Sequence, residues 1–212
     1  MAQLLGLPMA ARRSLGCRGL AGSPRSAGPI SGGLPSTPGS SSYDVCVVGG
    51  GVIGSAVGYF LSERLGRSSR VAVVERDPTY QYASFARSNS CIRQQYTTPA
   101  SVLMMQFAVD FLRRAPEVLA CDANPSPDIS FKERGYLFLG QEEHRETMQL
   151  LNRVQRGLGA DVDLLDSQEV AKRFPWLNTE DLALGSFGNT SEGWFNPDGF
   201  ATALRKKAQS QG

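Results

Sequence analysis

The sequence of 212 residues has a single histidine and only four, widely spaced cysteines. One imidazole excludes a histidine-rich zinc site within the chain, and a Ser-His-Asp triad would have to be built around His144, which lies in a charged run and is predicted to be a solvated surface residue. The cysteines match neither a disulfide-dense secreted scaffold nor a paired-cysteine metal site; they are Cys17, Cys46, Cys91 and Cys121.

No acidic residue precedes Asp44, whereas this first segment carries four arginines and is rich in glycine, serine and proline. Arginine and serine without acids are typical of an organelle transit peptide, so residues 1–42 predict a disordered segment that directs the protein to mitochondria. A low-complexity tail without such a role is the alternative. The other 18 basic residues are balanced by 20 acidic ones, and this slight acidity gives no indication of a nucleic-acid partner.

No membrane span is predicted. The uncharged run of residues 45–61 contains only 17 residues, about 26 Å as a helix, and three consecutive glycines stand inside it. A buried strand, a tight turn and a buried helix explain this run better than a transmembrane helix.

The glycine-rich turn is the most informative motif in the chain. Residues 43–48 form a β-branched run that predicts a central parallel strand covered on both faces, and residues 55–65 predict a helix. Between them the G-x-G-x-x-G pattern places Gly49 at the tight turn, Gly51 where a backbone approaches a pyrophosphate, and Gly54 where helix packs on strand. No Lys-Ser or Lys-Thr pair follows, so a P-loop is excluded.

A second predicted strand, residues 70–74, ends in Glu75. An acidic side chain at this place accepts hydrogen bonds from ribose hydroxyls and repels a 2′-phosphate. The order of strand, glycines, helix, second strand and acid predicts a dinucleotide-binding unit. The acid disfavours NADP.

Four stretches give the chain a more specific resemblance. They are VVGGGVIG (47–54), VVERD (73–77), SFARSNSCIRQQY (84–96) and EGWFNP (192–197). From Tyr43 onward the chain resembles the N-terminal half of the D-amino-acid oxidase and sarcosine oxidase group of FAD-dependent oxidoreductases. The resemblance implies FAD rather than NAD. It also implies an α/β fold, with a Rossmann-type FAD-binding βαβ unit followed by the start of a mixed α+β substrate domain.

The resemblance also implies site residues. The candidate FAD-binding residues are Gly49, Gly51, Ile53, Gly54, Glu75, Arg76, Ser84, Ser88 and Asn89, the last three in a loop beside the flavin. Arg93 matches an arginine that receives the substrate carboxylate, and a guanidinium suits that role because it binds carboxylates bidentately. A surface arginine that caps a helix or pairs with an acid is the alternative. Ser90 stands where the sarcosine oxidase branch has another arginine, so the substrate and the oxidant are open. No catalytic base is assigned.

The rest of the chain alternates between further predicted helices and strands. Helices are expected at 99–120, at 142–157, at 167–174 with Ser167 as N-cap, and from Asn196 onward with residues 205–207 near its basic C-terminal end; strands are expected at 135–139 and 161–165. The predicted organisation is a transit-like segment (1–42), the first part of the FAD domain (43–120), a partial substrate domain (121–195) and a helix that returns to the FAD domain (196–212).

The resemblance implies that the group continues beyond Gly212 into further strands. We therefore expect a truncated form that lacks the C-terminal half, leaves an open sheet edge and binds FAD weakly or not at all. For the whole protein, the first expected function is hydride transfer to FAD from a small amine- or hydroxy-carboxylate. A mitochondrial branch of the group, linked to the assembly of respiratory complex I, implies the alternative: an assembly factor at the matrix side of the inner membrane that binds assembly intermediates without turnover.

Overall fold

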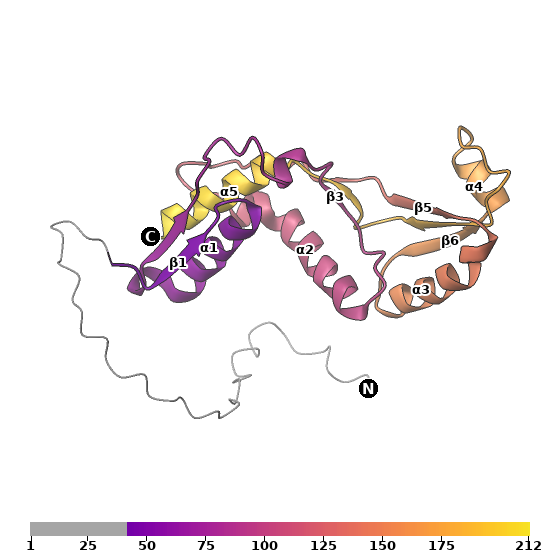
Figure 1. Cartoon of the computed structure of the whole chain (residues 1–212), viewed down its shortest axis with the longest axis horizontal. Helices are drawn as coiled ribbons and strands as arrows, with labels where there is room; N and C mark the ends of the chain where they lie inside the picture. The colour runs from indigo at the N-terminus through magenta and orange to yellow at the C-terminus, as the bar shows by residue number, and fades with distance from the viewer. Residues whose placement is uncertain (1–41) are drawn as a thin grey trace, which may run out of the picture. The chain divides into compact units, whose positions relative to one another are not determined.

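The structure is a computed structural model that describes residues 42–212. It begins with a βαβ unit: strand β1 (Val45–Val48), helix α1 (Val52–Leu65), a short 3₁₀ turn η2 (Gly66–Ser68) and strand β2 (Val71–Val74) (Figure 1). The two strands are parallel and pair Val45 with Val71 through Val48 with Val74. Helix α1 begins at Val52, three residues before the predicted start, because the last glycine of the motif is already helical.

The prediction that the first strand is central and covered on both faces is wrong. Among the described residues β1 pairs only with β2, and the Val48 side chain at its end is 86% exposed. Among the described residues, the edges of this two-stranded sheet are therefore open.

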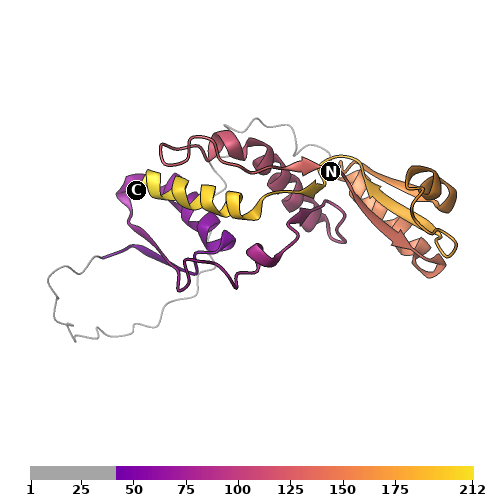
Figure 2. The ribbon, with the colours of Figure 1, turned by 90° about the horizontal axis from the view of Figure 1, so that it is seen from above.

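Helix α5 (Pro197–Gln211) packs along α1, and Figure 2 shows the two lying side by side. Tyr59 of α1 and Leu204 of α5 are both fully buried in one apolar core, together with Leu112 and Leu119. At the far end of the pair, Ser62 Oγ donates a hydrogen bond of 2.7 Å to Gln211 Oε1. This core fixes the helix that carries the glycine-rich turn.

Helix α2 (Pro99–Val118) contributes the third face of this core. The Thr98 hydroxyl caps its first turn by accepting from the Ser101 N–H, and Pro99 occupies the first helical position, where its missing N–H costs nothing. The helix ends two residues before the predicted Ala120.

The remaining elements form two small antiparallel sheets. One has the order β3-β8-β4, from β3 (Cys91–Ile92), β8 (Gly193–Trp194) and β4 (Lys132–Glu133); the other has the order β5-β7-β6, from β5 (Tyr136–Gly140), β7 (Leu184–Gly188) and β6 (Val162–Asp166). Helix α3 (Arg145–Gly157), preceded by the 3₁₀ turn η4 (Glu142–His144), and helix α4 (Ser167–Arg173) pack against the second sheet.

Two details of the predicted helices are wrong. Asp166, not Ser167, caps α4: its carboxylate accepts from the Glu169 N–H while the Glu169 side chain accepts from the Asp166 N–H, a complete capping box. The basic residues 205–207 lie in the middle of α5, whose last turn has no basic residue. In the part of the chain that the structure describes, no helix is long and apolar enough to cross a membrane.

Candidate functional site

The site is built around Glu75, the first residue after β2. Its Oε2 accepts a hydrogen bond of 2.7 Å from the Gly50 N–H, and its Oε1 accepts one of 2.9 Å from the Asp77 N–H. The backbone donors of Asp77 and Gly50 lower the pKa of the Glu75 carboxyl below its ordinary value, so the side chain is ionised at neutral pH. The negative charge therefore lies directly beside the glycine-rich turn.

The three glycines of the motif differ in what their missing side chains allow. Gly49 has a φ of +98°, a conformation that L side chains rarely adopt. A Cβ on Gly54 would overlap the carbonyl oxygen of Gly49, so this glycine is required for the fold. A Cβ on Gly51 would meet nothing nearer than 3.8 Å, the ring of Phe85, so the space in front of Gly51 is open.

The first turn of α1 points unpaired amides at that space. Ser55 is the first residue whose N–H bonds into the helix, to Gly51 O at 2.8 Å, so the N–H groups of Val52, Ile53 and Gly54 come before the helical ladder. No side chain caps this end, and no acid stands in the first turn. Such a helix end is suited to a phosphate.

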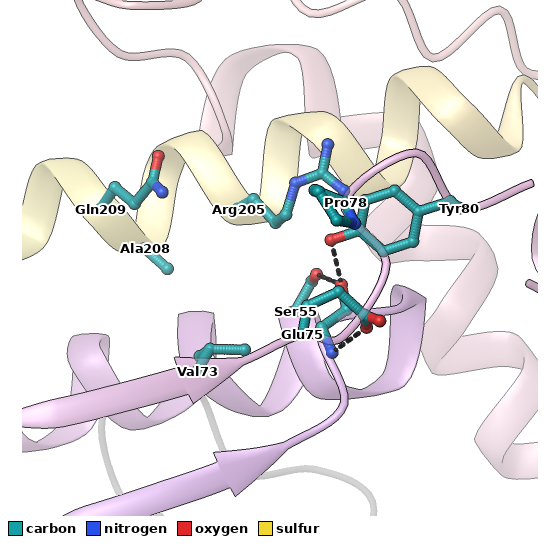
Figure 3. Close-up of a pocket in the computed structure, with 9 residues that line it drawn as sticks. Ser55, Val73, Glu75, Pro78, Tyr80, Arg205, Ala208 and Gln209 are labelled. Atoms are coloured by element: carbon teal, nitrogen blue, oxygen red, sulfur yellow. Dashed lines mark hydrogen bonds between the residues drawn. The ribbon is translucent and has the colours of Figure 1, made fainter.

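Two cavities meet at Glu75. One of about 450 Å³ is lined by Gly49, Gly51 and Arg76 in addition to Glu75. The other, of about 470 Å³, is lined by Gly50, Ser55 and Arg205 in addition to Glu75 (Figure 3). The first cavity collects four of the predicted FAD-binding residues.

The other predicted FAD-binding residues are placed differently. The Ile53 side chain is 79% exposed and lines an apolar cavity between α1 and α2, so only its backbone faces the turn. Ser84, Ser88 and Asn89 flank the 3₁₀ turn η3 (Phe85–Arg87) with exposed side chains, and Ser88 Oγ accepts from the Ser90 N–H. Ser90, which stands where the sarcosine oxidase branch has another arginine, is buried and has a φ of +51°.

Arg93 lies directly after β3 at a separate cavity of about 300 Å³. Its guanidinium lies over three aromatic rings, at 4.7 Å from Tyr96, 5.4 Å from Tyr136 and 5.1 Å from Phe138. It makes no salt bridge with any acid of the described residues, and only its Nε donates, to Gln95 O at 3.4 Å. His144 is exposed, as predicted, and lines the same cavity.

A buried acid lies behind this cavity. Glu192 is fully buried; its Oε1 accepts from the Gln94 N–H at 2.7 Å and its Oε2 from Gln95 Nε2 at 2.8 Å. Gln95 in turn accepts from the Ser186 hydroxyl, so the segment that carries Arg93 is tied to β7. Burial raises the pKa of the Glu192 carboxyl, although the hydrogen bonds from Gln95 and Gln94 oppose this effect.

Residues 44–212 match the family described as FAD dependent oxidoreductase. The chain belongs to this family. The resemblance and the fold class predicted from the motifs are thereby confirmed.

Comparisons with known proteins show the extent of the similarity. "FAD-dependent oxidoreductase domain-containing protein 1" of Bos taurus is 44% identical over 171 residues, which are 80% of this chain and 35% of that protein. Among solved structures, L-proline dehydrogenase from P. horikoshii gives a TM-score of 0.67 at 27% identity, covering 80% of this chain and 42% of the other. Glycine oxidase from Geobacillus kaustophilus gives 0.66 at 29% identity, covering 80% and 45%. The chain spans about a third of the length of the first curated relatives it matches, 35%, 34% and 32%.

FAD is the cofactor of this family, and the residues of this flavoprotein fit it. The open space before Gly51 and the unpaired amides of the first turn of α1 match a pyrophosphate, and the ionised Glu75 matches a ribose. No group of three or more potential metal-ligating side chains occurs within residues 42–212.

Two residues that line the cavities at Glu75 escaped the sequence-based prediction. Tyr80 closes the turn, since its hydroxyl donates to Gly50 O at 3.0 Å. The Arg205 guanidinium lies 4.5 Å from the centre of the Tyr80 ring, and its buried Nη1 has no hydrogen-bond partner among the described residues (Figure 3). No pattern in the sequence links positions 80 and 205, because α5 brings them together only in the folded chain.

Proposed function

We propose that this chain carries the part of a flavoprotein oxidoreductase that holds the FAD pyrophosphate and ribose and anchors a small carboxylate substrate. The whole enzyme would take a hydride from the carbon next to an amine or a hydroxyl of that substrate. The observation that carries the proposal is the contact of the ionised Glu75 with the Gly50 N–H at the uncapped start of α1.

Each part of the predicted FAD site has its own role in this proposal. The backbone at Gly49, Gly51, Ile53 and Gly54 surrounds the pyrophosphate, and Glu75 accepts from the ribose hydroxyls. Arg76 lines the cavity beside them, and the loop with Ser84, Ser88 and Asn89 borders the flavin. When bound, FAD supplies the hydride acceptor.

Substrate anchoring falls to Arg93. Its terminal nitrogens have no acceptor among residues 42–212, and three aromatic rings hold the guanidinium in place. A planar guanidinium with free N–H groups binds a carboxylate bidentately. Relatives named glycine oxidase and sarcosine oxidase subunit beta, as well as L-proline dehydrogenase, support a small amino-acid-like carboxylate.

The test separates cofactor binding from folding. In Gly51→Ala the added methyl group meets no atom closer than 3.8 Å and the backbone stays in an ordinary extended region, so the variant is expected to keep the thermal stability of the apoprotein. The methyl group would stand where the pyrophosphate approaches. Full-length protein with this change should lose the flavin absorbance that the unchanged protein retains after gel filtration. Retention of stoichiometric FAD by Gly51→Ala would overturn the proposal.

The second candidate is a mitochondrial assembly role at respiratory complex I, with the flavin fold used for binding. Its support is the acid-free, arginine-containing start of the sequence, which lies outside the described residues, and an exposed apolar surface that includes Ile53 (79% exposed) and Phe107 (59% exposed). Anaerobic bleaching of the flavin by small carboxylates favours the enzyme. Loss of complex I in cells that lack the protein, with no substrate that bleaches the flavin, favours the assembly role.

A further inference from the structure

Both polar groups of the Gly50 backbone have partners. The Gly50 N–H donates to Glu75 Oε2 at 2.7 Å. The Gly50 carbonyl oxygen accepts from two hydroxyls, Ser55 Oγ at 2.8 Å and Tyr80 Oη at 3.0 Å (Figure 3). Ser55 belongs to α1 and Tyr80 to the loop after β2, so two segments of the chain converge on one carbonyl oxygen of the glycine-rich turn.

The orientation of this carbonyl group fixes that of the next N–H. A peptide unit is planar and trans, so the C=O of Gly50 and the N–H of Gly51 point in opposite directions. The Gly50 oxygen is held towards Ser55 and Tyr80, and the Gly51 N–H is therefore turned away from them. This N–H has no acceptor within residues 42–212, and Gly51 lines the cavity of about 450 Å³ that collects four of the predicted FAD-binding residues.

The glycines alone do not fix this orientation. Neither Gly50 nor Gly51 has a side chain, so little steric hindrance opposes rotation of the peptide unit between them. A reversed unit would present the carbonyl oxygen of Gly50 where the N–H of Gly51 now points, and an oxygen there would repel a phosphate. The ionised Glu75 lines the same cavity and already disfavours an anion, so the direction of each N–H matters.

Tyr80 belongs to a closed ring of hydrogen bonds. The Gly50 N–H donates to one oxygen of Glu75, and the other oxygen accepts from the Asp77 N–H. The Asp77 carbonyl oxygen accepts from the Tyr80 N–H at 3.1 Å, and the Tyr80 hydroxyl returns to Gly50. Tyr80 has a φ of +56°, which is unfavourable for a bulky side chain. Such strain persists where the surrounding contacts impose it, and it is concentrated at functional sites.

Two side chains hold the Tyr80 ring in place. The Arg205 guanidinium of α5 lies 4.5 Å from the centre of this ring, and the centre of the Phe85 ring lies 5.5 Å from it. The position of the Tyr80 hydroxyl on the turn therefore depends on the packing of α5.

We propose that Tyr80 is a positioning residue for the diphosphate of FAD: its hydroxyl, together with that of Ser55, holds the Gly50–Gly51 peptide unit so that the Gly51 N–H donates to the cofactor. The inference rests on the proposed function, in which the glycine-rich turn surrounds the pyrophosphate. It adds two side chains that act through the backbone of the turn.

The experiment compares ADP with adenosine by isothermal titration calorimetry on the full-length apoprotein. Both ligands carry the ribose that Glu75 is proposed to bind, but only ADP carries the diphosphate. Tyr80→Phe removes one oxygen atom and keeps the ring beside Arg205, so the affinity for ADP should fall about fivefold while that for adenosine stays the same. Ser55→Ala removes the other donor to the same oxygen and should show the same selective loss. A general loosening of the fold would weaken both ligands.

Tyr43→Phe and Ser62→Ala are the matched controls. Tyr43 also lies beside an arginine, and Ser62 is a buried serine of α1 that also donates to a carbonyl oxygen, but neither lines a cavity at Glu75. Both variants should keep the ratio of the ADP and adenosine affinities.

Two results would overturn the inference alone. Either Tyr80→Phe binds ADP as tightly as the unchanged protein does, or its affinities for ADP and adenosine fall by the same factor. If the unchanged protein binds neither FAD nor ADP, the proposed function is wrong and the inference falls with it, so the two failures are distinguishable.

Discussion

The carboxylate of Glu75 accepts a hydrogen bond from the Gly50 N–H at 2.7 Å, although the two residues are 25 positions apart. The contact joins the end of β2 to the glycine-rich turn after β1. The predicted FAD site is therefore formed by segments that are distant in the sequence, and each of its residues can be tested by a separate substitution.

Glu75→Gln keeps the shape of the side chain and removes its charge. One of the two oxygens that accept from Gly50 and Asp77 becomes an amide nitrogen, so the turn loses a partner and the ribose loses an acceptor. We expect the affinity for FAD to fall roughly tenfold, measured by flavin fluorescence during titration of the apoprotein. The control, Glu63→Gln on the exposed face of α1, should bind FAD normally; equal affinities for all three proteins would contradict the assignment.

Gly54→Ala should destabilise the fold itself. The new Cβ would overlap the carbonyl oxygen of Gly49, and backbone cannot move aside as a flexible side chain can. A drop in the midpoint of thermal unfolding is expected even without FAD. Gly157→Ala at the end of α3 is the control, because no atom lies within 4 Å of its added Cβ and alanine favours helices by about 1 kcal/mol. Similar midpoints for the two variants would refute the close approach of helix and turn.

Arg93→Lys should weaken carboxylate binding while leaving the fold intact. A lysine keeps the charge but loses the planar pair of donors and the stacking on Tyr96, Tyr136 and Phe138. Calorimetry with a small carboxylate should show a loss of about tenfold or more. Arg173→Lys is the control, since Arg173 also stacks on a ring, Phe187 at 4.1 Å, but does not line the cavity. The same loss in both variants would remove Arg93 from the substrate site.

Glu192 makes the stability depend on pH. Burial raises its pKa in the folded state above the ordinary 4.5, so the folded protein holds this proton more tightly than the unfolded chain. This contribution is complete below about pH 4.5 and is lost as the pH rises through the folded-state pKa, by up to about 1.4 kcal/mol per pH unit. Urea unfolding between about pH 4 and pH 8 should therefore show Glu192→Gln gaining on the unchanged protein as the pH rises. Parallel curves, as expected for the exposed control Glu143→Gln, would show that burial does not govern Glu192.

Local patterns were sufficient to predict the first βαβ unit. Three local requirements appear in the sequence at fixed spacing. Gly49 has a positive φ, any side chain at position 54 would overlap the Gly49 carbonyl oxygen, and an acid follows the second strand. At the start of α4, Asp166 and Ser167 are both good caps, and the Glu169 three positions after Asp166, which completes a capping box, is the sequence signal that decides between them.

The residues that were missed depend on contacts between distant segments. Tyr80 and Arg205 meet only when α5 lies along α1, and the Gln155 amide reaches the Tyr96 carbonyl oxygen only when α3 lies beside the segment before α2. The burial of Glu192 likewise follows from the meeting of the segment after β3 with β8. Neither spacing nor composition encodes these meetings, so the sequence predicted the βαβ unit but not the contacts between its distant segments.

The packing of α1 on α5 has a consequence for biosynthesis. Tyr59 meets Leu204, and Ser62 meets Gln211, only after α5 has been translated and has left the ribosome. During vectorial synthesis the glycine-rich turn is thus made first, and its contacts with α5 form last. A nascent chain stalled before α5 should leave this turn accessible to proteases and chaperones, although every residue of its motif has already emerged.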